Sequence, residues 1–170
     1  MNTSKKLIGI FYGNLALLIL IFTTILGSIP VLVLGLLKLL PNQNLKIYCT
    51  KIVDKIATVW VEINKIYLGK FNPTRMEITG ANNFNSEDWY LVVANHQSWL
   101  DIVILQHLLN RKIPVLKFFI KDQLKWIPFL GFSWWAMGCP FMKRYTPTYL
   151  AKNPHKKGKD LEATQKALVL

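Results

Sequence analysis

The hydrophobic pattern divides the chain into an apolar beginning and a longer remainder in which polar residues recur. Lys5 and Lys6 are followed by a run without charged residues from position 7 to position 37. As one helix, these 31 residues would be about 46 Å long. The hydrocarbon core of a bilayer is only about 30 Å thick, so the run is too long for one untilted span and too short for two. We expect a membrane anchor.

The middle of this run contains a predicted break. Gly27, Ser28 and Pro30 lie there, and a proline disrupts the helical turn that precedes it. The run is therefore either one span ending near Gly27 with an apolar continuation, or a bent or re-entrant hairpin. Lysines lie on both sides of it, so the positive-inside rule selects no orientation for a simple span. The charges fit a hairpin, or an in-plane anchor, with both ends in the cytoplasm.

The remainder of the chain alternates between helical and strand-like patterns. Residues 45–68 carry apolar positions at helical spacing, with lysines on other faces, which predicts an amphipathic helix. Residues 89–94 (WYLVVA) form a nearly continuous apolar run, typical of a buried strand. This alternation favours an α/β layer structure with partly parallel pairing. The further expected strands are residues 75–79, 113–119 and 136–142, and the further expected helices are residues 99–109 and 156–167.

Composition narrows the class of protein. The chain has 170 residues, 52% of them hydrophobic and 18% charged, with a net charge of +12. A disordered chain would be poorer in apolar residues, and an ordinary soluble domain carries about 25% charged residues. An apolar and basic chain suggests an anionic membrane as its partner. Nucleic acid would explain the charge alone, and no recognition motif supports it.

The two cysteines, Cys49 and Cys139, are too few for a disulfide scaffold and are expected to be free thiols. No Cys or His pair has the spacing of zinc ligands, so we expect no metal site.

Candidate chemistry follows the predicted strand at residues 89–94. The segment 95–101 (NHQSWLD) places His96 in a loop and Asp101 in the first turns of a helix. The carboxylate could reach one imidazole nitrogen and leave the other as a proton acceptor, like the His–Asp half of a hydrolase triad. The chain has no G-x-S-x-G elbow, so the nucleophile would be a hydroxyl of the substrate. Taken alone, this spacing favours the alternative of an ordinary helix start beside an exposed aspartate.

Two blocks resemble a known family. NHQSWLD is similar to the N-H-x-x-x-x-D block of the glycerolipid acyltransferases, in particular the lysophosphatidic acid acyltransferase (1-acylglycerol-3-phosphate O-acyltransferase) family. Residues 138–144 (GCPFMKR) resemble its second block, G-x-x-F-x-x-R, and residues 121–131 (KDQLKWIPFLG) resemble the stretch between the two. The resemblance extends over nearly the whole chain and is closest to an inner-membrane branch of Gram-negative bacteria. It implies the bacterial inner membrane, with the catalytic part facing the cytoplasm.

The resemblance also implies a reaction. A fatty acyl group would move from acyl-CoA or acyl-carrier protein, as co-substrate, to the hydroxyl of a lysophospholipid, lysophosphatidic acid first, with no cofactor and no acyl-enzyme. By this analogy His96 is the general base and Asp101 orients it. Arg144 would hold the acceptor phosphate, Gly138 would permit close backbone approach, and Phe141 belongs to the same substrate-binding block.

The chain departs from the family pattern after the second block. An acidic E-G-T-R-type block and a later apolar, proline-bearing block are not found in these 170 residues. We therefore expect residues 1–40 to be a membrane anchor, 41–70 an amphipathic helix, and 71–170 the N-terminal part of an acyltransferase α/β domain, apparently truncated. The strand ending at Met142 would then have an unpaired edge. The alternative is a non-catalytic membrane-surface protein that keeps only part of the fold.

Overall fold

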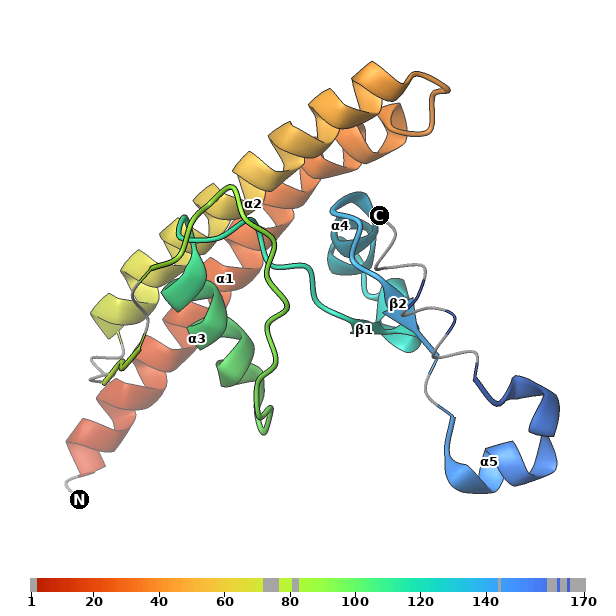
Figure 1. The fold of residues 1–170 in the computed structure, drawn as a ribbon. Helices are drawn as coiled ribbons and strands as arrows, with labels where there is room; N and C mark the ends of the chain where they lie inside the picture. The colour runs from red at the N-terminus through yellow and green to blue at the C-terminus, as the bar shows by residue number, and fades with distance from the viewer. Residues whose placement is uncertain are drawn as a thin grey trace. The chain divides into compact units, whose positions relative to one another are not determined.

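The protein is described by a computed structural model and is mostly helical (Figure 1). The structure describes residues 3–71, 77–80, 83–143, 145–158, 162 and 165. The elements in chain order are α1 (Thr3–Leu37), α2 (Gln43–Phe71), α3 (Trp99–Leu109), β1 (Ile120–Lys121), the 3-10 helix η1 (Asp122–Trp126), α4 (Leu130–Ala136), β2 (Phe141–Met142), α5 (Pro147–Lys152) and the 3-10 helix η2 (Pro154–Lys156). The chain forms two compact units, one from residues 1–27 and 54–116 and one from residues 28–53 and 117–170.

The apolar run forms one helix, α1, which continues through Pro30. The break expected near Gly27 is therefore wrong, and so is the hairpin within residues 7–37. A single proline removes one backbone hydrogen bond, which a helix of 35 residues tolerates. Residues 7–37 are long and apolar enough to cross a membrane, and only 11% of the most apolar window is buried. The helix therefore presents a large apolar surface that the described chain leaves uncovered.

The amphipathic helix expected at residues 45–68 is confirmed as α2. Asn42 caps the N-terminus of α2, since its Oδ1 accepts a hydrogen bond from the backbone N–H of Leu45 at 3.1 Å. Cys49 and Val53 are buried on one face, and Lys51 is exposed on another. The loop at residues 38–42 reverses the chain, so that α2 (orange to yellow in Figure 1) runs back along α1.

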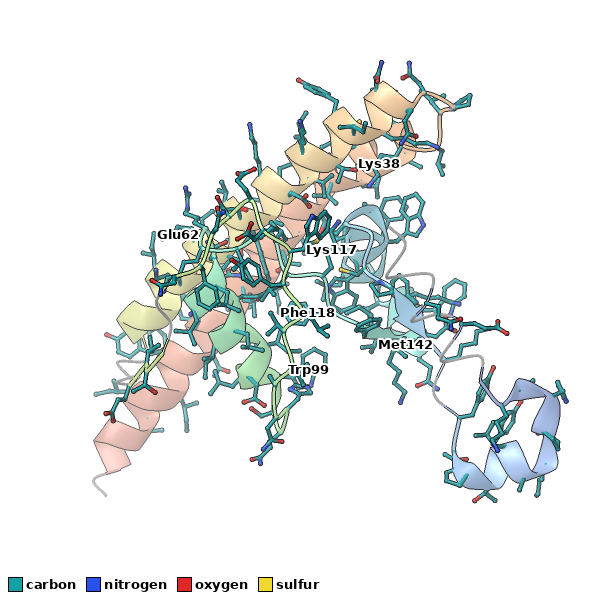
Figure 2. All side chains as sticks on the ribbon, viewed as in Figure 1. Lys38, Glu62, Trp99, Lys117, Phe118 and Met142 are labelled. Carbon is teal, nitrogen blue, oxygen red and sulfur yellow. The ribbon has the colours of Figure 1, made fainter. Side chains whose placement is uncertain are left out.

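Polar contacts hold the end of α3 against α2 within the first unit. The Asn110 amide Nδ2 donates to the carbonyl oxygen of Thr58 at 3.2 Å and to Oε2 of Glu62 at 3.1 Å. Arg111 adds an exposed ion pair, with its Nε 3.7 Å from Oε2 of Glu62, labelled in Figure 2. The helix expected at residues 99–109 is confirmed, and these contacts fix its C-terminal end.

The buried strand expected at residues 89–94 is wrong. Residues 83–97 contain no regular strand, and their side chains are exposed. From Trp89 to Val93 the exposed fractions alternate, at 92%, 37%, 79%, 38% and 85%. This period of two is that of an extended backbone, but a strand also needs a neighbour for its N–H and C=O groups, and the described residues supply none. Of the strand expected at 75–79, residues 75 and 76 lie outside the described residues, and 77–79 have no regular structure.

The second unit contains a parallel pair of strands. β1 pairs with β2 in the register Ile120–Phe141 and Lys121–Met142. The expected parallel pairing is confirmed, but the strands are shorter than predicted: residues 113–119 precede β1, and Ala136 ends a helix. Within the described part of the chain, β2 pairs only along the side facing β1. The α/β class is thus only loosely supported. The helix expected at 156–167 falls mostly outside the described residues.

A close contact joins the end of α1 to α4 in the second unit. A Cβ atom added at Gly35 would lie 2.9 Å from the Cβ of Ala136 and 3.1 Å from a ring carbon of Phe132. The Ser133 hydroxyl donates to that of Ser28 at 3.1 Å. Lys38, labelled in Figure 2, donates from its Nζ to the carbonyl oxygen of Ala136 at 2.8 Å and so satisfies an acceptor at the helix end. The glycine lets α4 pack directly on the α1 backbone.

Replacing Gly35 by alanine is expected to loosen α4. The added methyl group has no room, and overpacking costs about 1–3 kcal/mol. Gly13→Ala is the matched control in the same helix, because a Cβ there meets nothing within 4 Å. Amide hydrogen exchange of α4 in the full chain should quicken for Gly35→Ala and stay unchanged for Gly13→Ala. Equal exchange in both variants would contradict the packing role of Gly35.

Candidate active site

The structure brings His96 and Asp101 together at the start of α3. Nδ1 of His96 lies 3.3 Å from Oδ2 of Asp101. The same carboxylate oxygen accepts hydrogen bonds from the backbone N–H groups of Gln97 at 2.6 Å and Ser98 at 2.7 Å. The His96 side chain is 57% exposed, so its ring remains accessible from solvent while one edge faces the carboxylate.

The local sequence explains this geometry. Ser98 is the N-cap of α3, with an extended backbone (φ −148°, ψ 162°), and Asp101 is the third residue of the first turn. A carboxylate at that position reaches back to the N-cap N–H, which is one half of a capping box. The positive end of the helix dipole adds to the attraction. The S-x-x-D pattern therefore folds the loop and places the carboxylate beside the histidine in one step.

Hydrogen bonding favours the ionised form of the Asp101 carboxyl group. The backbone N–H of Ser98, followed by that of Gln97, holds the pKa of Asp101 below its ordinary value of 3.8, with a smaller contribution from His96. An ionised carboxylate facing Nδ1 favours the tautomer that carries its proton there. The lone pair of Nε2 is then left on the far side of the ring, where it can accept a proton from a hydroxyl group.

A second histidine in the same unit has a different environment. His107, near the end of α3, is partly buried, and its Nε2 has no hydrogen-bond partner within the described part of the chain. Burial lowers its pKa, Lys65 lowers it further, and Glu62 opposes the shift. His107 is therefore kept neutral inside the fold, which fits a packing role better than proton transfer.

Gly138 ends α4 by a change of backbone direction. Its φ is +77°, and its N–H donates to the carbonyl oxygen of Trp135 at 2.9 Å, while the N–H of Cys139 donates to that of Trp134 at 2.9 Å. This is a Schellman ending, which favours glycine. The nearest atom to an added Cβ would be Nζ of Lys117, at 3.8 Å. The positive φ is thus one structural reason for glycine here, and the close approach expected at the site stays a prediction.

The remaining residues of the second block follow directly. Phe141 is partly buried in β2, and Arg144 lies outside the described residues. His96 and Asp101 belong to the first unit and Gly138 and Phe141 to the second, so the structure defines each half of the predicted site within its own unit. The substrate-binding roles of the second block stay predictions.

The segment between the blocks is held by two unusual backbone positions. Phe129 has a φ of +64°, and the N–H of Leu130 donates to the carbonyl oxygen of Pro128 at 2.7 Å, which forms a strained γ-turn. A Cβ at Gly131 would overlap the carbonyl group of Lys125. The W-I-P-F-L-G sequence at 126–131 therefore folds η1 tightly against the start of α4.

A cavity beside the second block was not foreseen from the sequence. Its volume is about 320 Å³, and it is lined by Lys121, Asp122, Gln123, Met142, Lys143, Tyr145, Thr146 and Tyr149. The mixture of basic and aromatic residues in the segment MKRYTPTY was the available signal. Among the residues that the structure describes, no cluster of three or more His, Cys, Asp or Glu could hold a metal ion. Cys49 and Cys139 are buried and free of disulfides.

Comparison with known proteins defines the family. The family model described as Acyltransferase matches residues 75–170, more than half of the chain, and the chain belongs to this family. It is similar to 1-acyl-sn-glycerol-3-phosphate acyltransferase alpha from Homo sapiens and from Mus musculus, at 35% identity over 71 residues in each case. These alignments cover 41% of this chain and 24% of each relative. The resemblance to the lysophosphatidic acid acyltransferases is thereby confirmed.

The matched stretch spans about a quarter of the length of these curated relatives. The bovine protein of the same name matches equally, with 35% identity over 71 residues and 23% of its length covered. No solved structure matches the chain significantly.

The Asp101 carboxyl should titrate below 3.8. Carbon-detected NMR of the full chain would measure this. Ser98→Ala should change the midpoint little, because the Ser98 backbone N–H is the largest cause of the shift and the Ser98 hydroxyl the smallest. Since the folded pKa is lowered, the ionised group stabilises α3 above the unfolded value, and this stabilisation is lost as pH falls through the folded pKa. A midpoint at or above 3.8 would contradict the cap.

Proposed function

We propose that the protein is a membrane-bound acyltransferase that moves a fatty acyl group from a thioester to the hydroxyl of a lysophospholipid. The observation that carries this proposal is the carboxylate of Asp101 beside Nδ1 of His96, in a chain of the acyltransferase family. Lysophosphatidic acid is the first candidate acceptor, because the similar curated proteins are named for 1-acyl-sn-glycerol-3-phosphate. The donor is acyl-CoA or acyl-carrier protein.

The proposed chemistry is a direct transfer. Nε2 of His96 takes the proton of the acceptor hydroxyl while that oxygen attacks the thioester carbonyl carbon. The C–O bond forms, the C–S bond breaks, and the leaving thiolate receives the proton from the imidazolium. Asp101 remains ionised and stabilises the imidazolium that forms between the two steps. The ester and the free thiol are the products, and the enzyme carries no acyl group.

The second block is proposed to hold the acceptor. The planar guanidinium of Arg144 offers paired N–H donors that suit two oxygens of a phosphate. Gly138 turns the chain out of α4 and toward β2, which begins at Phe141. In this proposal Arg144 of the second block recognises the charged end of the lysophospholipid and the first block activates its hydroxyl.

The membrane is the proposed location. Many large apolar side chains of α1 are at least half exposed, among them Leu7, Phe11, Leu18 and Phe22, and soluble monomers rarely expose a continuous apolar surface of that size. A lipid phase would cover it, and the net charge of +12 favours an anionic leaflet. We propose the bacterial inner membrane, with the catalytic part facing the cytoplasm.

His96→Ala is expected to lower acyl transfer by about 10²- to 10⁴-fold, the usual contribution of a general base. Asp101→Asn should give a smaller loss, because it keeps the shape of the side chain but removes the charge facing Nδ1. His155→Ala is the control, since His155 lies exposed in η2. The measurement is transfer of a radiolabelled acyl group to lysophosphatidic acid by the full chain in phospholipid nanodiscs.

Full activity in His96→Ala would exclude the proposed base. If the unaltered chain transfers no acyl group from either donor but still binds membranes, the alternative holds: a non-catalytic membrane-surface protein with part of the fold. The lack of an E-G-T-R-type block in these 170 residues is the observation behind that alternative.

A charge placed in α1 is expected to weaken membrane attachment. Leu18→Lys puts an ammonium group on the apolar helix, where a charge at the bilayer centre costs about 2.5–3.5 kcal/mol. Tyr48→Lys in α2 is the matched control, because Leu18 and Tyr48 are 63% and 64% exposed. Flotation with anionic liposomes should recover less of Leu18→Lys than of the unaltered chain or the control. Equal recovery of all three would argue against α1 as the anchor.

A further inference from the structure

The cavity of the second unit includes Met142 and Lys143 of the second block, and its other lining residues lie outside that block. One part of its wall comes from the end of β1 and the start of η1, and the other from the end of β2, the loop that follows it and α5. Small-molecule sites usually have volumes of about 300–1,000 Å³, so a cavity of about 320 Å³ fits one end of a large ligand. Met142, labelled in Figure 2, marks its position on β2.

The charge of the wall favours an anion. Lys121 and Lys143 both line the cavity and are exposed. Asp122 is the one acidic residue in the lining, and Nζ of Lys125 lies 3.0 and 3.1 Å from its two carboxylate oxygens, which offsets its charge. From position 123 to position 159 the sequence contains no aspartate or glutamate. Ammonium groups without nearby carboxylates suit phosphate oxygens.

Two stacked tyrosines form the other part of the wall. The rings of Tyr145 and Tyr149 are 5.1 Å apart and nearly parallel, at 9°. Nζ of Lys156 lies 5.7 and 5.0 Å from the two ring centroids and donates a hydrogen bond to the hydroxyl of Tyr149 at 2.6 Å. That hydrogen bond is the main cause of the raised pKa of Lys156, so a cation stays beside the rings.

The tyrosines are held in place by the short helix α5. Thr146 caps it, with its hydroxyl oxygen accepting the backbone N–H of Tyr149 at 3.3 Å. The Asn153 amide Nδ2 donates to the carbonyl oxygen of Tyr149 at 3.1 Å at the other end. These contacts hold the backbone of Tyr149, and the hydrogen bond from Lys156 holds its hydroxyl group, so less side-chain entropy would be lost on binding.

A flat aromatic face next to ammonium groups fits a nucleotide. We propose that this cavity binds the adenosine 3′-phosphate 5′-diphosphate end of a coenzyme A thioester, with the base against the Tyr145–Tyr149 pair and the phosphates at Lys121 and Lys143. Any nucleotide base can stack on an aromatic side chain, because every base has a flat π face. The inference rests on the proposed acyl transfer and names its donor, because an acyl-carrier protein presents a pantetheine arm without the adenine nucleotide. The pantetheine arm would extend outside the cavity.

The direct test is binding of coenzyme A to the full chain in nanodiscs of neutral lipid, measured by calorimetry. Lys143→Gln is expected to weaken binding about five- to tenfold, as for a charge-assisted contact near the surface. Lys157→Gln is the matched control, because it removes the same charge from the same segment outside the cavity lining. Tyr149→Leu should weaken binding, while Tyr149→Phe keeps the ring and should retain most of it.

Donor comparison provides a second readout. The ratio of kcat/KM for acyl-CoA to that for acyl-pantetheine should exceed one and should fall toward one in Lys143→Gln. No binding of coenzyme A, or equal effects of Lys143→Gln and Lys157→Gln, would overturn the site. So would competition by anionic vesicles combined with a loss of vesicle binding in Lys143→Gln, which would assign the cavity to lipid headgroups.

The two proposals fail in distinguishable ways. Transfer from acyl-carrier protein without coenzyme A binding would overturn the nucleotide site and leave the acyltransferase intact. Coenzyme A binding that depends on Lys143 and Tyr149, with no transfer from any donor, would overturn the acyltransferase and leave the site.

Discussion

The packing of α4 on the last turns of α1 is the contact on which the second unit depends. Gly35 allows the two backbones to approach, and Lys38 satisfies the carbonyl group at the end of α4. That end is also where Gly138 turns the chain toward β2, and β2 then pairs with β1 and forms part of the cavity wall. One helix contact thus determines the direction of the chain into the second block, and it lies at the end of the apolar helix.

In the first block, one carboxylate group makes both the helix cap and the contact with the histidine. A single oxygen of Asp101 accepts two backbone N–H groups and faces the imidazole of His96. The capping contact stabilises the start of α3, and the same contact lowers the pKa of the Asp101 carboxyl group. Local stability and the orientation of the proposed base therefore have one cause. A substitution at Asp101 cannot affect one without the other, so activity measurements on such a variant need a structural measurement beside them.

What could be predicted from the sequence depended on how far apart the interacting residues are. α3 and the His96–Asp101 contact follow from spacings of a few residues, and α2 follows from its apolar period. The prediction of a strand at residues 89–94 was wrong because the preference of these residues for an extended backbone is local, whereas the strand they would pair with must come from a distant part of the sequence. Pro30 was expected to break α1, but a long apolar helix outweighs one missing hydrogen bond. The cavity was not predicted because Lys121 and Tyr149 lie far apart in the sequence and line the same cavity only through the pairing of β1 with β2.

Within the described part of the chain, no strand pairs with the extended segment from Trp89 to Val93, which carries no charge, proline or glycine. Such a segment can pair through its backbone with an extended peptide, including the same segment of another copy. Self-association through this segment would increase with concentration and would decrease wherever another strand covers it.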